Sequence, residues 1–206
     1  PFYLAYALEE EPASLGDPEE WFAEWKWDGI RGEIIKRNGQ LFVWSRGEEL
    51  MTEKFPEYAP LQELLPEGIV LDGEMICLSA AESDRIDFVP LPFALLQTRI
   101  GRKNISKKQL SEAPVGFIAY DLLEFGGDDF REKSQAERRS ALEKVTAEIH
   151  NPVLRLSPLI PFSGWGELAV MRSGSREVGS EGLMLKRKNA VYQTGRKRGD
   201  WWKWKI

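Results

Sequence analysis

Residues 22–31 read FAEWKWDGIR, and this stretch decides how the rest of the chain is interpreted. Side chains alternate along an extended strand, so Glu24 and Lys26 share one face while the flanking tryptophans share the other. Residues 30–37 look like a second strand that follows at once. A row of polar side chains on a strand is either a solvated face or a face directed at a polar partner. Other parts of the chain must decide between the two.

The composition favours one soluble domain without a disulfide framework. At 206 residues and 42% hydrophobic, the chain can bury a substantial core and is near the upper size of a single domain. The single cysteine, Cys77, excludes an internal disulfide, and the lone His150 excludes a histidine-based zinc or catalytic cluster. The sequence contains neither an apolar run long enough for a membrane span nor a signal-peptide pattern. We therefore expect an intracellular protein without a membrane partner.

The net charge of −5 is unevenly distributed along the chain. From Lys186 to Ile206 there are eight basic residues against Asp200 alone, a net charge of +7 that leaves −12 for the rest. Tryptophans at 201, 202 and 204 are interleaved with these cations. This combination suits a polyanion, because cations neutralise phosphates while flat rings stack or pack alongside. A solvated basic tail is the alternative.

The spacing of apolar residues predicts an α+β protein built on antiparallel sheet. Strands are expected at 20–27, 30–37, 41–46, 68–78, 115–123, 182–187 and 200–206, and helices at 53–65, 91–100, 106–112, 134–149 and 165–172. The Asn38-Gly39 pair predicts a tight hairpin turn between the second and third strands. Because hairpins are mixed with helices, an antiparallel sheet system is favoured over a doubly wound parallel sheet.

Two central strands carry acidic residues among apolar ones. LDGEMI, residues 71–76, places Asp72 and Glu74 on one face, and buried carboxylates need cations or a metal. FIAYDLLEF, residues 117–125, places Tyr120 beside Asp121, a pair that on its own is most often ordinary core.

Two strands near the C-terminus carry the lysines. SEGLMLKR, residues 180–187, places Glu181 and Lys186 at the two ends of an apolar strand. WWKWKI, residues 201–206, alternates two further lysines, at 203 and 205, on one face. Each of these stretches is a weak signal when taken singly.

Their joint order is more specific. The series ExKxDGxR, SRG, DGE, aromatic–Asp, EGLMLK and WxKxK resembles the nucleotidyltransferase motifs of the ATP-dependent DNA ligases. These enzymes belong to a covalent superfamily with RNA ligases and mRNA capping enzymes. The resemblance runs from Glu24 to Lys205, and it includes a spacing of about five residues between the glutamate and lysine of EGLMLK. It implies one nucleotidyltransferase domain over residues 1–206, with antiparallel β-sheets flanked by helices and an ATP-grasp-like fold.

The resemblance implies that Lys26 is the nucleophile that attacks the α-phosphate of ATP and holds AMP through a phosphoramidate bond. A lysine attacks only as the neutral amine, a form that nearby cations favour. Asp28 and Gly29 complete the signature, and glycine lets the backbone turn close to the nucleotide. Three lysines are expected to supply the cationic field and to bind phosphates: Lys186, Lys203 and Lys205. Lys26, Asp28, Lys203 and Lys205 are thus the expected catalytic residues.

The resemblance to the ligase motifs also implies which residues contact the nucleotide. Glu24 resembles the residue that helps to read adenine, and Tyr120 resembles the aromatic that stacks on the base, although many relatives have phenylalanine there. Stacking is tolerant of base identity, so hydrogen bonds must supply the preference for adenine. Arg31 and Arg46 resemble the arginines around the ribose and phosphates, where guanidinium groups offer paired donors.

A divalent ion is also implied. Glu74 resembles a carboxylate that serves the ribose hydroxyl and the metal, and Glu181 resembles its second acidic partner. Hard oxygen ligands and a triphosphate indicate Mg²⁺, with Mn²⁺ as a substitute. The alternative is that these two glutamates form buried ion pairs with Lys186 or Lys205, and both arrangements are compatible with different steps.

The expected partner is nicked double-stranded DNA, with Arg196, Lys197 and Arg198 on its backbone. Ligases of this kind carry a C-terminal OB-fold domain after the last lysine motif. We expect that this OB-fold domain is absent from these 206 residues. We expect a monomer, in the cytoplasm and nucleoid if the source is prokaryotic. The alternatives are an RNA ligase, a capping-type enzyme that uses GTP, or a nucleotide-dependent DNA-binding module without catalysis. An intact Lys26 with all its partners argues against the last.

Overall fold

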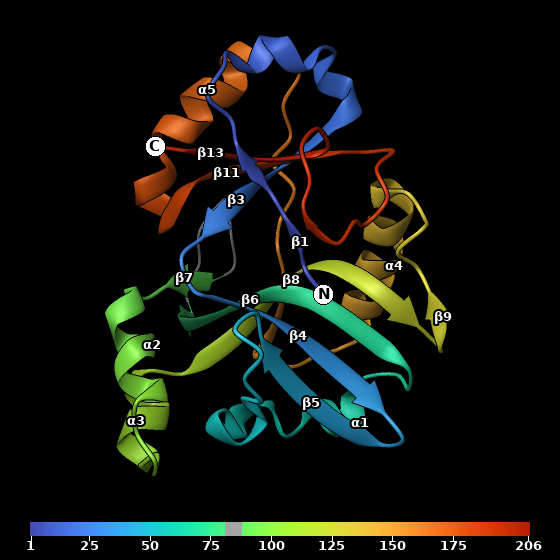
Figure 1. Cartoon of the computed structure of the whole chain (residues 1–206). Helices are drawn as coiled ribbons and strands as arrows, with labels where there is room; N and C mark the ends of the chain where they lie inside the picture. The colour runs from blue at the N-terminus through green and yellow to red at the C-terminus, as the bar shows by residue number, and fades with distance from the viewer. Residues whose placement is uncertain (81–87) are drawn as a thin grey trace. The chain divides into compact units, whose positions relative to one another are not determined.

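The computed structural model describes residues 1–80 and 88–206, and the chain divides into two compact units (Figure 1). Unit 1 contains Pro1–Trp27, Arg131–Glu137 and Ser157–Ile206, and unit 2 contains Asp28–Phe130 and Arg138–Leu156. Each unit is described by itself. Across residues 1–80 and 88–206, no helix combines the length and the apolar character that a membrane span requires.

Unit 1 is built on a four-stranded sheet. Its strands follow the order β2 (Tyr6–Ala7), β13 (Trp201–Lys205), β11 (Ser180–Arg187) and β3 (Trp21–Trp27). β11 is antiparallel to both of its neighbours, whereas β13 pairs with β2 in parallel. β1 (Tyr3–Leu4) and β12 (Gly195–Arg196) form a separate parallel pair. The strand with the FAEWKWD sequence therefore lies beside the strand with EGLMLK, which itself lies beside WWKWK.

Helical segments of unit 1 are short. α5 (Trp165–Ser173) contacts β11, and the 3₁₀ turn η5 (Ser175–Val178) leads from α5 into that strand. Two further 3₁₀ turns, η1 (Pro12–Leu15) and η2 (Pro18–Glu20), precede β3. Asp17 caps the start of η2 by accepting a hydrogen bond from the Glu19 amide. The turn ends at Glu20, directly before the lysine-bearing strand β3.

Unit 2 is built on a larger sheet. The main path is β10 (Leu154–Leu156), β8 (Val115–Phe125), β6 (Ile69–Ala80), β4 (Ile30–Arg37) and β5 (Gln40–Ser45). β7 (Phe88–Pro90) pairs with β6, and β9 (Asp128–Asp129) pairs with β8. All pairs are antiparallel except that of β10 with β8. The hairpin turn between β4 and β5 has positive φ at Asn38 and Gly39, as the sequence predicts.

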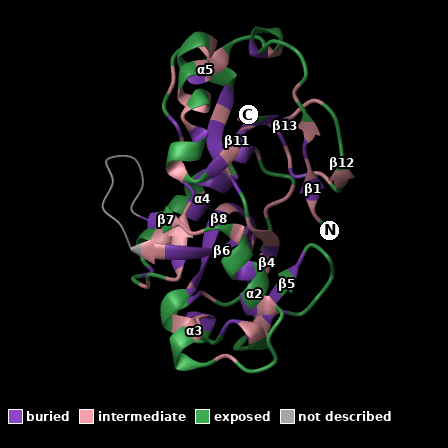
Figure 2. Ribbon diagram, turned by 90° about the vertical axis from the view of Figure 1, so that its left-hand side faces the viewer, coloured by how far each residue is buried: buried purple, intermediate pink, exposed green. Residues whose placement is uncertain are grey.

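Helices and short turns complete unit 2. They are η3 (Thr52–Lys54), η4 (Pro56–Tyr58), α1 (Leu61–Leu64), α2 (Phe93–Ile100) and α3 (Lys107–Glu112), together with most of α4 (Gln135–Ala147). The core of this unit joins apolar side chains of β4, β6 and β8 to those of α1, α2 and α4. Figure 2 shows buried residues running along β8 of this unit and β11 of unit 1, and exposed residues along α3.

Most of the predicted elements are confirmed, and one is wrong. The expected helix at 53–65 is instead two 3₁₀ turns and a single helical turn. Pro56 and Pro60 explain the difference, because proline lacks the amide that a helix interior needs and restricts the residue before it. The apolar residues of this segment are still buried, among them Phe55, Tyr58 and Leu61. Their spacing indicated burial correctly and helix length incorrectly.

Candidate functional site

One face of the sheet in unit 1 carries the charged residues of the FAEWKWDGIR stretch, Glu24 and Lys26, together with lysines of two other strands. In the register of the sheet, Met184 of β11 lies opposite Glu24 of β3 on one side and opposite Lys203 of β13 on the other. Residues directly opposite one another point to the same face, and so do residues two apart on one strand. Glu24 and Lys203 therefore share a face with Lys26 and Lys186.

Glu24 and Lys186 form a buried ion pair on this face. Lys186 Nζ lies 2.7 Å from Glu24 Oε2, and the two side chains are 2% and 4% exposed. A lysine is rarely buried without a partner, because an uncompensated ammonium is costly to remove from water. The polar row on β3 is therefore directed into protein rather than into solvent at Glu24.

Lys26 belongs to a second, more open cluster. Its Nζ lies 3.2 Å from Glu181 Oε2, and Lys205 Nζ lies 3.2 Å from the same oxygen. Lys26 is 24% exposed, so its amine remains within reach of a ligand. Of the two ion pairs considered for Glu181 from sequence, the one with Lys205 is present, and Lys186 forms an ion pair with Glu24.

A break in the register of β11 explains how Glu181 reaches these lysines. Glu181 and Lys186 are an odd number of residues apart, so a regular strand would place them on opposite faces. The pairing with β3 shifts between Ser180 and Leu183, and such a bulge reverses the alternation. Gly182 sits in the shift with φ of 139°, and its N–H and C=O both bond to the Ser180 hydroxyl. Ser180 and Gly182 thus fix the geometry of the Lys26 cluster.

In unit 2 the predicted nucleotide contacts gather around Arg31 of β4. The Arg31 guanidinium binds Asp72 through two hydrogen bonds, of 3.1 and 2.7 Å, and its carbon lies 5.8 Å from the centroid of the Tyr120 ring. The backbone amide of Arg46 donates to the Arg31 carbonyl at 2.8 Å. Arg31 is also opposite Glu74 in the register of β4 and β6. Arg31, Arg46, Glu74 and Tyr120 therefore form one local group.

Gly29 is required by close packing within unit 2. A Cβ on this residue would collide with the Met75 carbonyl oxygen and approach the Glu74 side chain to 3.0 Å. The glycine thus lets the segment after Asp28 run tightly against β6. Asp28 itself is exposed. The role of Gly29 in letting the backbone turn close to a nucleotide stays a prediction.

Several positioning residues were not assigned from sequence. Asp72 is fully buried and holds Arg31. Asp121 and Arg138 form an ion pair at 2.8 Å with neither side chain exposed, so the Asp beside Tyr120 ties β8 to α4. Arg172 of α5 lies 4.6 Å from the centroid of Trp204 and donates to the Lys205 carbonyl. A charged residue inside an apolar strand was the available signal for the aspartates, while arginines on helices gave none.

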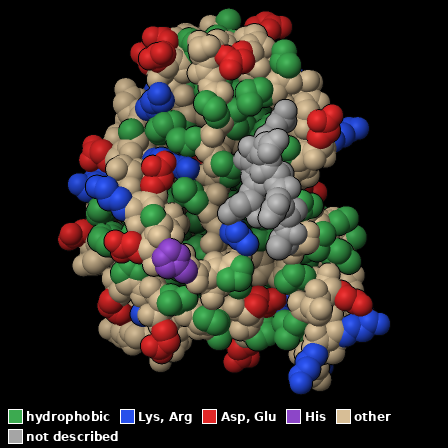
Figure 3. All heavy atoms as spheres, turned by 180° about the vertical axis from the view of Figure 1, so that it is seen from behind, with side chains coloured by type: hydrophobic (Ala, Val, Ile, Leu, Met, Phe, Trp, Pro, Cys, Tyr) green, Lys and Arg blue, Asp and Glu red, His purple; other side chains and the backbone are tan. Residues whose placement is uncertain are grey.

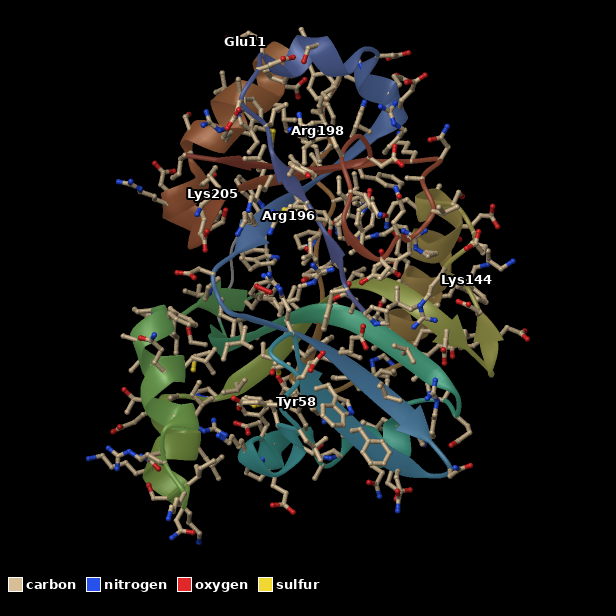
Figure 4. The ribbon with its side chains drawn as sticks, viewed as in Figure 1. Glu11, Tyr58, Lys144, Arg196, Arg198 and Lys205 are labelled. Atoms are coloured by element: carbon tan, nitrogen blue, oxygen red, sulfur yellow. The ribbon has the colours of Figure 1, made fainter. Side chains whose placement is uncertain are left out.

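The three residues expected to contact DNA lie at the end of β12 and at the start of the segment that leads from β12 to β13. Arg196, Lys197 and Arg198 are all exposed. On the face drawn in Figure 3, acidic and basic side chains are interspersed. Figure 4 shows Arg196 and Arg198 beside the N-terminal strands of unit 1, where Arg196 donates to the Ala5 carbonyl at 2.9 Å and Arg198 lies 4.6 Å from the Tyr6 ring centroid. Packing of this kind orders two of the three cations.

Carboxylates suited to a metal are present singly rather than as a ready-made cage. In the part of the chain that the structure describes, there is no group of three or more His, Cys, Asp or Glu side chains that could hold a metal ion. Glu74 is 9% exposed and Glu181 is partly exposed. One or two carboxylates with substrate phosphates are a common way to bind Mg²⁺, so these residues fit an ion that arrives with a nucleotide.

A lysine row with an accessible amine, and an arginine beside an aromatic ring, are features that suit the binding of a nucleotide. The family model described as "ATP dependent DNA ligase domain" matches residues 5–205. The chain therefore belongs to the family of ATP-dependent DNA ligase domains, which confirms the resemblance seen in the motif series.

Individual relatives agree. A probable DNA ligase of Sorangium cellulosum is 30% identical over 201 residues, which cover 97% of this chain and 36% of that protein. A DNA ligase of Aeropyrum pernix is 31% identical over 179 residues, which cover 84% of this chain and 28% of that protein. The chain thus spans about a third of the length of these relatives.

Solved structures give the same fold. A mycobacterial DNA ligase D in complex with ATP and MES has a TM-score of 0.74 at 29% identity, over 99% of this chain and 60% of that one. The Chlorella virus DNA ligase-adenylate has a TM-score of 0.67 at 22% identity, over 99% of this chain and 68% of that one. The second likeness concerns the fold alone. Together they confirm the expected α+β architecture of antiparallel sheets flanked by helices.

Proposed function

We propose that this chain is the adenylation domain of an ATP-dependent DNA ligase and that Lys26 carries the AMP. The observation that supports the assignment best is the Lys26 cluster. Lys26 is a partly exposed amine on a sheet face that also carries Lys186, Lys203 and Lys205, and its Nζ lies 3.2 Å from the Glu181 carboxylate. An amine with room for a ligand and cations beside it suits attack on a phosphate.

The first step is a nucleotidyl transfer. The neutral Lys26 amine attacks the α-phosphorus of ATP, a P–N bond forms, and the bond from that phosphorus to the bridging oxygen breaks. The electron pair of the broken bond leaves with pyrophosphate, and the proton lost by the amine passes to the Glu181 carboxylate or to water. Lys203 and Lys205 stabilise the charge that grows on the leaving group, as does Lys186. Asp28 is proposed as a further catalytic residue.

The remaining residues bind the nucleotide. Tyr120 stacks on adenine, and Glu24 contributes to reading its edge. Arg31 and Arg46 bind the ribose and phosphates, with Arg31 held in place by Asp72. A guanidinium already oriented by a buried carboxylate loses less conformational freedom when a ligand binds.

We also propose a divalent ion, Mg²⁺ or in its place Mn²⁺, that arrives with the nucleotide phosphates, and we assign Glu74 and Glu181 as its candidate carboxylate ligands. It would supply positive charge that neutralises phosphate oxygens. Glu181 already forms ion pairs with Lys26 and Lys205. We therefore assign its role as a lysine partner and its role as a metal ligand to different steps of the reaction.

The later steps require DNA. AMP passes from Lys26 to the 5′-phosphate at a nick, and attack by the 3′-hydroxyl then forms the phosphodiester bond and releases AMP. Arg196, Lys197 and Arg198 are the proposed backbone contacts. We propose that the whole protein acts as a monomer and includes a C-terminal OB-fold domain, for which the greater length of the relatives leaves room.

The experiment is to incubate the chain with α-labelled ATP or GTP and Mg²⁺ and to measure label that survives denaturation. We expect label from ATP, and none with Lys26→Arg, because a guanidinium stays protonated and cannot attack. Label from GTP alone would favour a capping-type enzyme. Label retained in the Lys26→Arg protein would overturn the assignment of the nucleophile, and binding without any label would favour a non-catalytic module.

A further inference from the structure

Lys186 has a second contact besides Glu24, and it is the face of Trp201. The Lys186 Nζ lies 4.6 Å from the centroid of the Trp201 ring, and the two residues are opposite one another in the register of β11 and β13. Trp201 is 1% exposed and Lys186 is 2% exposed. The contact is therefore removed from water, where a cation attracts the face of an aromatic ring more strongly than it does at the surface.

The orientation of Trp201 is fixed by residues from three other segments. Its ring stacks on Tyr3 with centroids 4.4 Å apart and planes at 19°. The edge of Tyr192 meets it at 5.7 Å and 87°. Its indole N–H donates to the buried Gln135 Oε1 at 2.9 Å. A ring held by one stacked partner, one edge-on partner and one hydrogen bond cannot turn its face away from the lysine without losing these contacts.

Lys186 is thus placed between an anion and a π face. Glu24 alone could hold the ammonium anywhere around its carboxylate, because a Lys ammonium has three rotatable donors on a flexible stem. The ring attracts the cation without neutralising it and without offering a proton acceptor. We propose that Trp201 is a positioning residue that sets where the Lys186 ammonium lies. This inference rests on the proposed function, in which Lys186 binds the phosphates of ATP.

The test changes the charge distribution of the ring but not its overall shape. Tryptophan at position 201 is replaced site-specifically by analogues with increasing numbers of fluorine atoms, which withdraw electron density from the face. We expect the rate of Lys26 adenylation at subsaturating ATP to fall stepwise with fluorination, by about 2- to 30-fold in total, the range that a cation–π contact supports. The same analogues at Trp165, a partly buried indole whose N–H donates to the Gly16 carbonyl, serve as the control.

A second measurement shows whether the effect acts through the lysine. Denaturant unfolding is measured for the same series in the natural background and in Lys186→Met/Glu24→Gln, which removes the cation together with its anion. We expect the denaturant concentration at the midpoint of unfolding to fall with fluorination only in the protein that contains Lys186. An equal fall in both backgrounds, or a rate unaffected by fluorination at 201, would show that Trp201 is only a packing residue. Failure of the proposed function would look different, because the unmodified chain would then take no label at all.

Discussion

Charged residues of the candidate site are held in place by other charged residues. Lys186 is paired with Glu24, Lys26 with Glu181, and Arg31 with Asp72. Removing one partner of a buried pair such as Glu24–Lys186 costs far more stability than the pair contributes, because the other charge is left without compensation. Substitutions that test binding are therefore best made at residues outside these pairs.

Tyr120 is such a residue. Tyr120→Phe keeps the aromatic face, so we expect it to bind ATP and to form the Lys26 adenylate normally. Tyr120→Ala removes the face and should weaken ATP binding by about 1–3 kcal/mol, the usual size of a base–aromatic stack. Binding is measured by titration with ATP in the presence of Mg²⁺. Equal affinity in all three proteins would assign Tyr120 to packing beside Arg31 instead.

At the scale of the elements, the bulge in β11 is the feature on which the Lys26 cluster depends. Gly182 has φ of 139°, and a Cβ there would collide with the Trp204 carbonyl and lie 2.6 Å from Lys205 Cα. We expect Gly182→Ala to lower the free energy of unfolding by about 1–3 kcal/mol and to slow adenylation of Lys26, because both β13 and Glu181 must shift. Urea unfolding and label incorporation measure the two effects.

Gly166→Ala is the matched control for that substitution. Gly166 lies in α5, and a Cβ there would meet no atom within 4 Å. Replacing a helical glycine by alanine commonly stabilises by about 0.4–1 kcal/mol. If both alanine variants behaved alike, the bulge would have no special role in the cluster.

The elements also show what the sequence could predict. Strands with alternating or continuous apolar residues were placed correctly, because burial follows directly from the pattern. Alternation alone grouped Glu24 with Lys26 on one face of β3, and Lys203 with Lys205 on one face of β13. That these faces coincide, with Lys186 on the strand between them, follows only from the strand pairing in the structure. Alternation also could not give the side of Glu181. Its side depends on the bulge, and a bulge is set by local backbone geometry that the apolar pattern does not encode. The buried Asp121–Arg138 pair was missed for a similar reason, since long-range pairing of single charges leaves no periodic signal.

At the scale of the whole molecule, we expect the free energy of unfolding to fall at alkaline pH, because two buried acidic groups of unit 2 ionise more readily in the unfolded chain. Burial raises the pKa of the Cys77 thiol from 9.0 to about 11, so the folded state retains a proton that the unfolded state releases. The stability that the protonated Cys77 thiol contributes is fully present below pH 9 and is lost as the pH rises from 9 to 11. Over this range the free energy of unfolding falls by about 1.4 kcal/mol per pH unit. Burial also raises the pKa of Tyr58 well above 10.0, which extends the decline.

Urea unfolding of the chain at pH 8, 9 and 10 measures this dependence. Cys77→Ala should remove most of the slope between pH 9 and 10, where Tyr58 contributes little. An unchanged slope in that variant would show that other groups cause the alkaline loss.

The proposed binding of nicked duplex DNA would depend on the charge of the protein and therefore on the salt concentration. Replacing Arg196, Lys197 and Arg198 by glutamine should reduce the slope of log K against log salt by at most about three units, with little effect of DNA sequence. Adenylation by ATP alone should be nearly unchanged. A salt slope identical to that of the natural chain would place these residues in a solvated loop.

The central claim is that AMP becomes attached to Lys26, and its most direct test is to locate the adduct. The chain is incubated with ATP and Mg²⁺, denatured and digested, and the peptides are analysed by mass spectrometry. We predict one acid-labile AMP adduct, on the peptide that contains Lys26, which forms in the natural chain and in Tyr120→Phe. An adduct on another lysine, such as Lys186 or Lys203, or no adduct under conditions in which ATP binds, would contradict the claim.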